Sequence, residues 1–308
     1  MRGAGVRAFS AVVEPLQLAE PGPLRPDEVL LQVFAAGVGA WDELVRRGRW
    51  DIGLTPPMAM GVEAAGLVHS VGDRVTDLTV GERVMTHSLA LRGQGAWAEK
   101  FVVAAVHLAG IPADVPFEVA AVLPVPGLTA DQVLCDALRV QDHRGVSLLV
   151  HGGGGVTGTI LVQLAAHLGA DVIVTAGIRS APRLAAIATV LDRRSPTWPQ
   201  QVRRLTGGHG VDVAVNAVPF GAAQALTAVR AGGTLVTITA DRPPSERSVH
   251  VQSVVVVPDG PRLAGLGELV SAGALNILIE EVLPLDRAAE ALTRTVAGTG
   301  GRALVLQP

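Results

Sequence analysis

The chain has 308 residues, 49% hydrophobic and 17% charged, which supplies the core of one large or two ordinary globular domains and argues against an intrinsically disordered protein. Its net charge of −3, with no basic block, excludes a polyanion-binding surface, so we expect neither a nucleic-acid partner nor a membrane partner. The absence of tyrosine excludes a phenol as proton donor, and the one cysteine, Cys135, excludes an internal disulfide and a Cys-based zinc site.

The first hundred residues contain short apolar runs separated by glycine and proline turns. These runs predict strands at residues 28–34, 66–75, 81–85 and 98–103. Many short strands with glycine turns are typical of a small barrel-like β domain. Because no apolar leader follows Met1 and cysteine is almost absent, we expect a cytoplasmic protein.

From about Pro116 onward, strands alternate with helices. Residues 117–138 have helical spacing, interrupted by two prolines. The pattern then predicts strands at residues 146–151, 171–176, 211–218 and 234–240, and helices at residues 156–168, 181–188, 199–205 and 222–230. Since these strands are apolar throughout, we expect a parallel sheet covered on both faces, an α/β doubly wound nucleotide-binding domain. The remaining chain predicts strands at residues 251–257, 281–284 and 303–306 and helices at residues 262–271 and 288–296.

A glycine-rich loop lies between the first strand and the first helix of this domain. Residues 145–170 are apolar enough to suggest a membrane span, but four consecutive glycines break such a helix, so a buried strand and helix are expected instead. Gly153, Gly155 and Gly158 satisfy G-x-G-x-x-G in the required context. Glycines let the backbone approach a pyrophosphate, and the helix that begins at Val156 directs free N–H groups and its positive dipole end toward the phosphates.

The end of the next strand indicates which dinucleotide is bound. A site for NAD usually carries an acidic residue about twenty positions after the glycines, but residues 172–191 contain no Asp or Glu. This strand ends instead in Gly177-Ile-Arg-Ser. Arg179, and after it Ser180, suit the 2′-phosphate of NADP, so we expect NADPH; ordinary solvated helix-start residues are the alternative.

Several motifs in the same order resemble the medium-chain dehydrogenase/reductase superfamily, in its zinc-independent, quinone oxidoreductase-like branch. The resemblance implies a Rossmann domain at residues 118–258, inserted into a mainly-β GroES-like catalytic domain formed by residues 1–117 and 259–308. It also implies a homodimer joined through residues 251–257. The motifs lie at residues 37–42, 61–68, 71–75, 80–84, 120–130, 151–158, 210–213, 231–236, 257–260 and 285–292.

The resemblance assigns further positions to the cofactor. Thr129 corresponds to a contact with the nicotinamide end, and Asn216, Val218 and Thr239 correspond to residues that line the cofactor after two later strands. A helix-internal hydroxyl bonded to its own backbone is the alternative role for Thr129.

Two departures from the family pattern concern the catalytic side. The zinc ligands of metal-dependent relatives are missing, and Glu63 alone cannot hold a metal, so we expect no metal. We expect Glu63 to have a structural role or to lie at the edge of the substrate pocket. The family segment N-P-x-D-x-Y-x-R becomes residues 39–46, in which Leu44 replaces the tyrosine and Gly39 replaces the asparagine. Trp41 is new relative to the usual small aliphatic residue.

These departures leave the substrate pocket open to interpretation. Trp41, Leu44 and Trp97 are candidates for its wall, although core packing is an alternative for both tryptophans. Asp42 is a weak candidate for a proton donor and is mainly expected to be structural.

The pattern predicts an NADPH-dependent reductase that transfers hydride to a small-molecule quinone or α,β-unsaturated carbonyl compound without a metal. Quinone reduction fits Leu44 better, because solvent can protonate the oxygens of the product. Two alternatives remain open. One is a biosynthetic enzyme on the same fold that catalyses a non-redox cyclisation, elimination or isomerisation, and the other is a non-enzymatic NADPH-binding protein.

Overall fold

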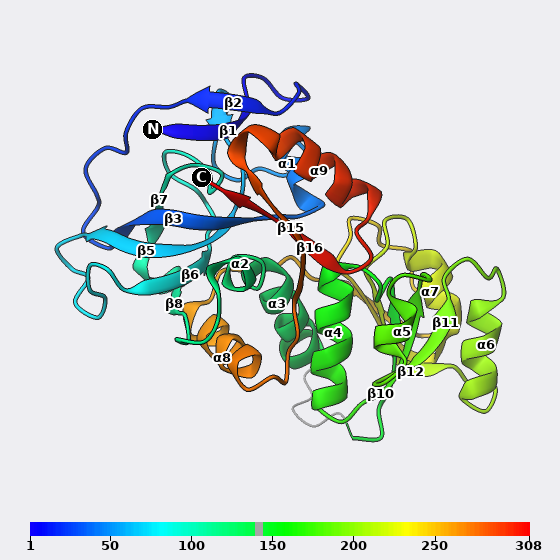
Figure 1. Cartoon of the computed structure of the whole chain (residues 1–308). Helices are drawn as coiled ribbons and strands as arrows, with labels where there is room; N and C mark the ends of the chain where they lie inside the picture. Colours follow the sequence, from blue (N-terminus) through cyan, green and yellow to red (C-terminus); the bar gives the residue numbers. More distant parts are fainter. Residues whose placement is uncertain (139–143) are drawn as a thin grey trace. The chain divides into compact units, whose positions relative to one another are not determined.

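A computed structural model describes residues 1–138 and 144–308 and divides the chain into two compact units (Figure 1). Unit 1 comprises Met1–Leu128 and Val257–Pro308, and unit 2 comprises Thr129–Val256. Unit 1 therefore extends to Leu128 in its first segment. The reason is that α2 (Phe117–Ala120) packs against strands of unit 1.

Unit 1 is built on two sheets. The smaller has the strand order β2-β1-β4, and the larger has the order β15-β16-β3-β5-β6-β8, with β7 also pairing with β3. Its helices are α1, α2, the first part of α3, α8 and α9, and the mainly-β arrangement fits the expected catalytic domain. The bounds are β1 (Arg2–Val6), β2 (Glu14–Gln17), β3 (Glu28–Val38), α1 (Trp41–Arg46), β4 (Met58–Ala59), β5 (Glu63–Val71), β6 (Arg83–His87), β7 (Lys100–Ala104), β8 (Leu108–Gly110), α3 (Pro124–Asp131), α8 (Gly260–Ser271), β15 (Leu278–Pro284), α9 (Ala288–Ala297) and β16 (Arg302–Gln307).

Strand β3 organises the larger sheet because it pairs with three other strands. Its side chains alternate at first, with Val29, Leu31 and Val33 buried and Gln32 exposed, as expected for a sheet with one face in the core. Its last four residues are all buried, so the end of β3 lies inside unit 1. This end leads directly into α1, which carries several of the predicted catalytic-side residues.

Unit 2 is a doubly wound α/β domain. Its six strands are all parallel, in the order β11-β10-β9-β12-β13-β14, with the glycine-loop strand β9 near the middle. After a π-type helical segment (Gln132–Ala137), the bounds are β9 (Ser147–His151), α4 (Val156–His167), β10 (Asp171–Ala176), α5 (Ala181–Leu184), β11 (Thr189–Asp192), α6 (Trp198–Leu205), β12 (Val211–Asn216), α7 (Ala222–Ala228), β13 (Val229–Thr237) and β14 (His250–Ser253).

The two faces of this sheet are covered by different helices. Leu149 and Ile173 share a buried cluster with Trp198 and Leu226, so α6 and α7 cover one face. Neighbouring positions in a strand point to opposite faces, so Val174 points to the other face, where α4 packs on β9 and β10. Burial on both faces explains why these strands are apolar throughout.

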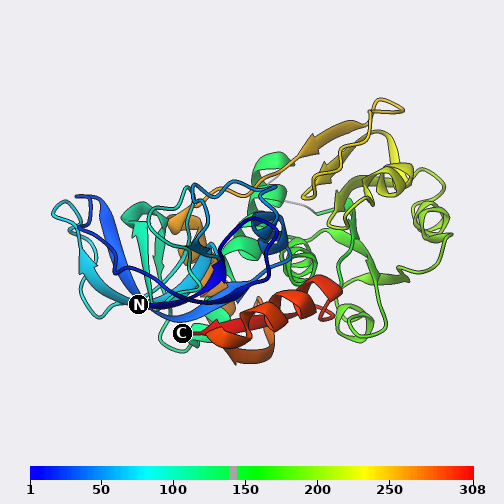
Figure 2. The ribbon, with the colours of Figure 1, turned by 90° about the horizontal axis from the view of Figure 1, so that it is seen from above.

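Three elements of unit 2 differ from the sequence-based prediction. The helix predicted to end at residue 188 ends at Leu184, and the unpredicted strand β11 follows it. The strand predicted at residues 234–240 runs instead from Val229 to Thr237. The strand predicted at residues 251–257 ends at Ser253 and forms the edge of the sheet, shown in gold in Figure 2.

No helix in the described part of the chain has both the length and the apolar composition needed to cross a bilayer. Helix α4, in the apolar stretch noted above, has 12 residues and begins after the glycines.

Candidate cofactor site

The glycine loop forms a tight turn at the carboxyl end of β9. Gly152 has a φ of +92°, and the N–H of Gly155 donates a hydrogen bond to its carbonyl at 3.2 Å. A Cβ on Gly153 would lie 2.0 Å from Cγ2 of Val174, and a Cβ on Gly158 would lie 2.3 Å from the carbonyl oxygen of Gly152. Gly153 and Gly158 are therefore required by the packing of the turn itself.

Helix α4 begins at this turn with its N-terminus uncapped. Gly155 is the N-cap residue, and no side chain accepts a hydrogen bond there. A Cβ on Gly155 would meet only the carbonyl oxygen of Gly152, at 3.8 Å, so the approach to the helix end is open on that side. Free N–H groups and the positive end of the helix dipole make this end suitable for an anion.

At the end of β10, the two residues predicted to bind the 2′-phosphate, Arg179 and Ser180, have different environments. Arg179 is exposed in the turn that follows the strand. Ser180 is 2% exposed, and its hydroxyl donates to the carbonyl of Gly177 at 3.2 Å. A Cβ on Gly154 would lie 2.5 Å from the same hydroxyl oxygen, so Ser180 packs against the glycine loop and helps to shape it.

Two arginines that the sequence analysis did not single out lie beside this turn. Arg193 and Arg194 follow β11 directly, and both are exposed. A Cβ on Gly177 would lie 3.1 Å from Nε of Arg193. Arg194 lines a hollow of about 560 Å³ between α5 and β11. No local pattern marks them, because β11 has only four residues and is recognised by its pairing with β10.

The loops after β12 and β13 form one hydrogen-bonded network. Asn216 is fully buried, and its Nδ2 donates to the carbonyl of Val218 and to Oγ1 of Thr239, both at 3.0 Å. Oγ1 of Thr239 donates in turn to Oδ1 of Asp241, whose Oδ2 accepts the N–H of Ala222 at the start of α7. Asn216 therefore fixes both loops from beneath, and Val218 and Thr239 remain half-buried at their surface.

His151, the last residue of β9, lies under the same edge of the sheet. Its ring stacks on Trp198 with centroids 4.6 Å apart, and its Nδ1 is 2.8 Å from Oγ1 of Thr175. Burial lowers the pKa of His151 to about 4, although the carboxylate of Asp241 opposes this shift. The imidazole is neutral at pH 7 and belongs to the floor of the site.

Two large apolar side chains are exposed on either side of the glycine loop. Ile178 follows β10 and is 86% exposed, and Phe220 follows β12 and is 93% exposed. Strand β9 lies between these two strands. Phe220 also has a φ of +61°, a strained backbone for a bulky residue. Exposed flat or branched side chains at such positions suit the faces of a heterocyclic ring.

The structure thus brings the predicted residues of unit 2 to one edge of the sheet, because the carboxyl ends of parallel strands meet there. Thr129 is the exception. It lies within α3 as the first residue of unit 2 and is 7% exposed.

The predicted catalytic-side residues of unit 1 gather around the end of β3 and the start of α1. A Cβ on Gly39 would lie 2.1 Å from two ring atoms of Trp41, so the indole occupies the space of any side chain at position 39. The N–H of Gly39 donates to Oδ2 of Asp42 at 2.8 Å. The two departures at positions 39 and 41 are therefore one change, because the indole requires the glycine.

Glu63 and Trp97 pack around Gly37 in the same region. Oε2 of Glu63 accepts the N–H of Val125 in the first turn of α3 at 2.7 Å, and a Cβ on Gly37 would lie 2.3 Å from Oε1. Nε1 of Trp97 donates to the carbonyl of Gly37 at 2.9 Å. Trp97 is 0% exposed, so it packs in the core and has no surface with which to line a pocket.

The two carboxyl groups of this region are buried without a cation. Asp42 is 0% exposed, and its Oδ1 has no hydrogen-bond partner among the described residues. Desolvation raises the pKa of Asp42 to about 8. Desolvation also raises the pKa of Glu63 well above its usual range, and the nearby Asp42 carboxylate adds to this effect. Asp42 is therefore mainly protonated at pH 7.

Of the predicted wall residues, only Leu44 and Trp41 reach the surface. Leu44 is 41% exposed, and Trp41 is half-buried. Within the described ranges, no three His, Cys, Asp or Glu side chains come together in a way that would hold a metal ion.

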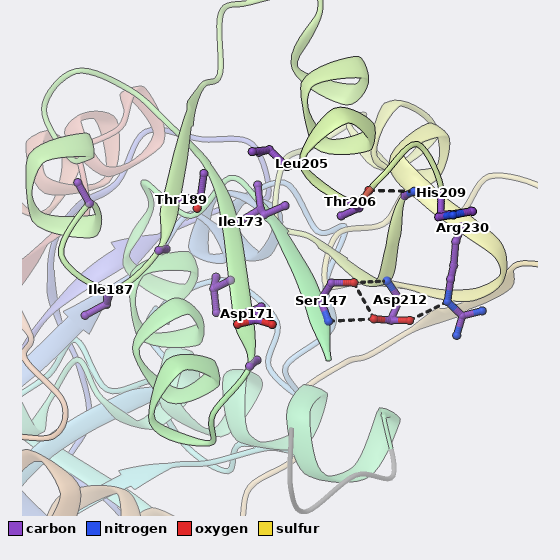
Figure 3. A pocket seen from close by; sticks show the side chains of 15 residues that line it. Ser147, Asp171, Ile173, Ile187, Thr189, Leu205, Thr206, His209, Asp212 and Arg230 are labelled. Carbon is purple, nitrogen blue, oxygen red and sulfur yellow. Dashed lines mark hydrogen bonds and ion pairs between the residues drawn. The ribbon is translucent and has the colours of Figure 1, made fainter. Parts of the chain in front are cut away.

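A second hollow lies at the opposite, amino end of the unit 2 sheet (Figure 3). It measures about 840 Å³ and is the larger of the two hollows described here. Three of its polar side chains form hydrogen bonds and an ion pair with one another. Asp212 accepts hydrogen bonds from the N–H and hydroxyl of Ser147, at 2.9 and 2.6 Å, and pairs with Nε of Arg230 at 2.7 Å. The glycine turn of the predicted site and the N-terminus of α4 follow the carboxyl end of β9, at the other end of the sheet.

Two family models match the chain, an alcohol dehydrogenase GroES-like domain over residues 25–113 and a zinc-binding dehydrogenase over residues 184–299. The chain is similar in fold over its full length to an NAD-dependent alcohol dehydrogenase, with 27% identity, a TM-score of 0.89 and complete coverage of both chains. The chain belongs to the medium-chain dehydrogenase/reductase superfamily.

Two further members of this superfamily are useful for comparison. A mycobacterial protein complexed with NADPH is 29% identical, with a TM-score of 0.86 and complete coverage of both chains. A 2-haloacrylate reductase from Burkholderia sp is 34% identical over 67% of this chain and 62% of that protein. The chain spans between 7% and 41% of other curated relatives, most of which are polyketide synthases. Since one of the two structures is named for NAD and the other holds NADPH, the choice of cofactor rests on the residues of this chain.

Proposed function

We propose that this superfamily member is an NADPH-dependent reductase of a quinone or an α,β-unsaturated carbonyl compound, and that it transfers hydride without a metal. The observation that carries the proposal is the open N-terminus of α4 behind a turn in which Gly153 and Gly158 leave no room for side chains. Such a turn admits a pyrophosphate to within hydrogen-bond distance of the backbone. The residues present therefore fit a nicotinamide dinucleotide.

Residues on several sides of this turn are proposed to bind and orient NADPH. The N–H groups at the start of α4 take the pyrophosphate, and Ile178 and Phe220 offer apolar faces to the adenine ring. Arg179 contributes positive charge at the ribose, while Val218 and Thr239 line the cofactor on loops that Asn216 holds in place. Thr129 is proposed to contact the nicotinamide end. When bound, NADPH supplies the hydride.

The absence of a phenolic donor favours substrates whose reduced form takes protons on oxygen. Quinone reduction meets this condition, since water protonates the oxygens without help from the chain. Leu44 and Trp41 then act as apolar contacts for the substrate. Asp42 is neutral at pH 7 but fully buried, and Glu63 holds the N–H of Val125 at the start of α3, so we assign neither of them to the reaction.

The experiment that tests the proposal is an NADPH titration by calorimetry, followed by an NADPH-oxidation screen over quinones, enones and 2-haloacrylate. We expect NADPH to bind more tightly than NADH and at least one quinone to drive its oxidation. Substrate turnover without NADPH oxidation would instead support the non-redox alternative, which the pair Gly39 and Trp41 motivates. Binding of NADPH with no turnover across the panel would support a non-enzymatic binding protein.

We also propose a homodimer joined through β14. This strand is at the edge of its sheet, so one row of its backbone groups has no strand partner among the described residues of unit 2. The chain that follows exposes Val255 and Val257, at 71% and 58%. Light scattering tests this assignment, and a monomer at micromolar concentration would contradict it.

A further inference from the structure

We infer that Arg193 is the residue that distinguishes a 2′-phosphorylated dinucleotide from its unphosphorylated form. The inference rests on the proposed function and names the specificity-determining side chain of the same site. The ligand group is a phosphate monoester on the adenosine ribose.

Arg193 is fixed beside the end of β10 by backbone pairing. Ala176 of β10 and Asp192 of β11 are register partners, so Arg193 stands opposite Gly177, one position further on. The N–H of Arg193 donates to the carbonyl of Ala176 at 3.1 Å, which continues the strand pairing. This bond holds the backbone at Arg193 in place, whereas Arg179 lies in the turn that follows β10.

The guanidinium lies where an acidic side chain would stand in a site for NAD. Any Cβ on Gly177 would lie 3.1 Å from Nε of Arg193. Gly177 has no positive φ, so its backbone does not require glycine, and its missing side chain leaves room for the arginine. The acceptor for ribose hydroxyls is thus replaced by a donor for phosphate oxygens.

The charge of Arg193 is available for a ligand. In the part of the chain that the structure describes, its guanidinium makes no hydrogen bond or ion pair. Other arginines of unit 2 are engaged: Arg230 pairs with Asp212, and Arg203 donates to backbone carbonyls of Thr227, Gly208 and His209. An exposed planar cation beside an open ribose position suits bidentate recognition of a phosphate.

Asp192 and Arg194, the charged neighbours of Arg193 in the sequence, line a hollow that Arg193 does not line. Arg194 lines the 560 Å³ hollow between α5 and β11, and its guanidinium also lacks a partner among the described residues. Asp192 lines the same hollow, but its Oδ1 accepts the N–H of Arg194 at 2.9 Å. Since successive strand side chains point to opposite faces, Asp192 points away from the face of Arg193.

The experiment measures the dissociation constants of the full chain for NADPH and NADH by calorimetry at one fixed ionic strength. Arg193→Ala is expected to raise the dissociation constant for NADPH by about 10- to 100-fold, which corresponds to the loss of one charged hydrogen-bond pair. The dissociation constant for NADH should stay the same. Gly177→Asp is expected to weaken the binding of NADPH, because the new carboxylate pairs with Arg193. It should tighten the binding of NADH, because the same carboxylate accepts hydrogen bonds from the ribose hydroxyls. Arg204→Ala, at an exposed arginine of α6, is the matched control and is expected to change neither constant.

The outcomes separate this inference from the proposed function. If the unmodified chain binds neither dinucleotide, the proposed function fails. If it prefers NADPH and Arg193→Ala keeps that preference, or weakens both dinucleotides equally, the inference alone is overturned. A larger loss of NADPH affinity in Arg179→Ala than in Arg193→Ala would also overturn it.

Discussion

The end of β3 in unit 1 and the carboxyl edge of the sheet in unit 2 were both singled out from sequence motifs, but they differ in how they treat charge. Unit 1 buries its ionisable groups, with Asp42 and Glu63 inside the fold and without a cation. Unit 2 exposes Arg193 and Arg194 after β11 and leaves the N-terminus of α4 uncapped at the glycine turn. Glycines in a motif therefore indicate a place where a ligand can approach the backbone. Carboxyl groups in a motif can instead be held in the core by packing.

The largest expected effect concerns the buried acid of unit 1. Because the pKa of Asp42 is raised from 3.8 to about 8, the folded state binds the proton that the unfolded state releases, so stability falls as pH rises from about 4 to 8. This loss amounts to as much as about 6 kcal/mol. Asp42→Asn should remove much of the slope in urea-unfolding midpoints between pH 5 and pH 8. Equal slopes in the two proteins would show that Asp42 is not a buried neutral acid.

The buried imidazole of unit 2 should respond in the opposite direction. Because the pKa of His151 is lowered from 6.5 to about 4, the unfolded state takes up the proton first, so stability falls as pH drops from 6.5 to 4. The contribution is about 3 kcal/mol. His151→Phe should make the unfolding midpoints less sensitive to acid over this range. If the sensitivity is unchanged, another group is responsible for the acid effect, such as His87, whose pKa is also lowered by burial.

A change at the glycine turn tests whether the open edge of unit 2 is the cofactor site. In Gly158→Ala, the new Cβ would clash with the carbonyl oxygen of Gly152 and displace the backbone of the turn. NADPH affinity should fall on the order of 100-fold, as expected when a binding group is displaced by about 1 Å. Calorimetry measures the loss, and circular dichroism confirms that the variant is folded. Unaltered affinity would remove the glycine turn from the site.

The indole packing of unit 1 predicts a coupled pair. Gly39→Asn alone should cost about 1–3 kcal/mol of unfolding free energy, because the new side chain and the Trp41 ring compete for one space. In the Trp41→Ala background the same substitution should cost much less. A double-mutant cycle by urea unfolding measures the coupling, and additive effects would show that the two positions vary independently.

The smallest effect is expected at the amino end of the unit 2 sheet. Asp212→Asn weakens the ion pair with Arg230 and the bonds to Ser147, and should cost about 1 kcal/mol of stability. NADPH affinity should stay the same, since this larger hollow has no open helix end. A clear loss of NADPH affinity would mean that the hollow of Figure 3 takes part in binding.

Much of unit 2 was predictable because its signals are local. Apolar strands, glycine turns and helix periods predicted β9, α4 and β10 within a residue or two, and parallel strands then required Gly153, Arg179 and Asn216 to share one edge. Strand β11 was not predicted, since its four residues have no period of their own and pair with β10 only after the sheet forms.

The fold class, the superfamily, the glycine turn and the missing phenol at Leu44 could all be inferred from the sequence, because each depends on residue type at a fixed spacing. Tertiary structure alone decided which side chains face a ligand. It placed Ser180 beneath the loop, Trp97 in the core and Arg193 over Gly177, and it joined Gly39 to Trp41. These outcomes depend on contacts between segments distant in the chain, and such contacts are set by packing and not by local pattern.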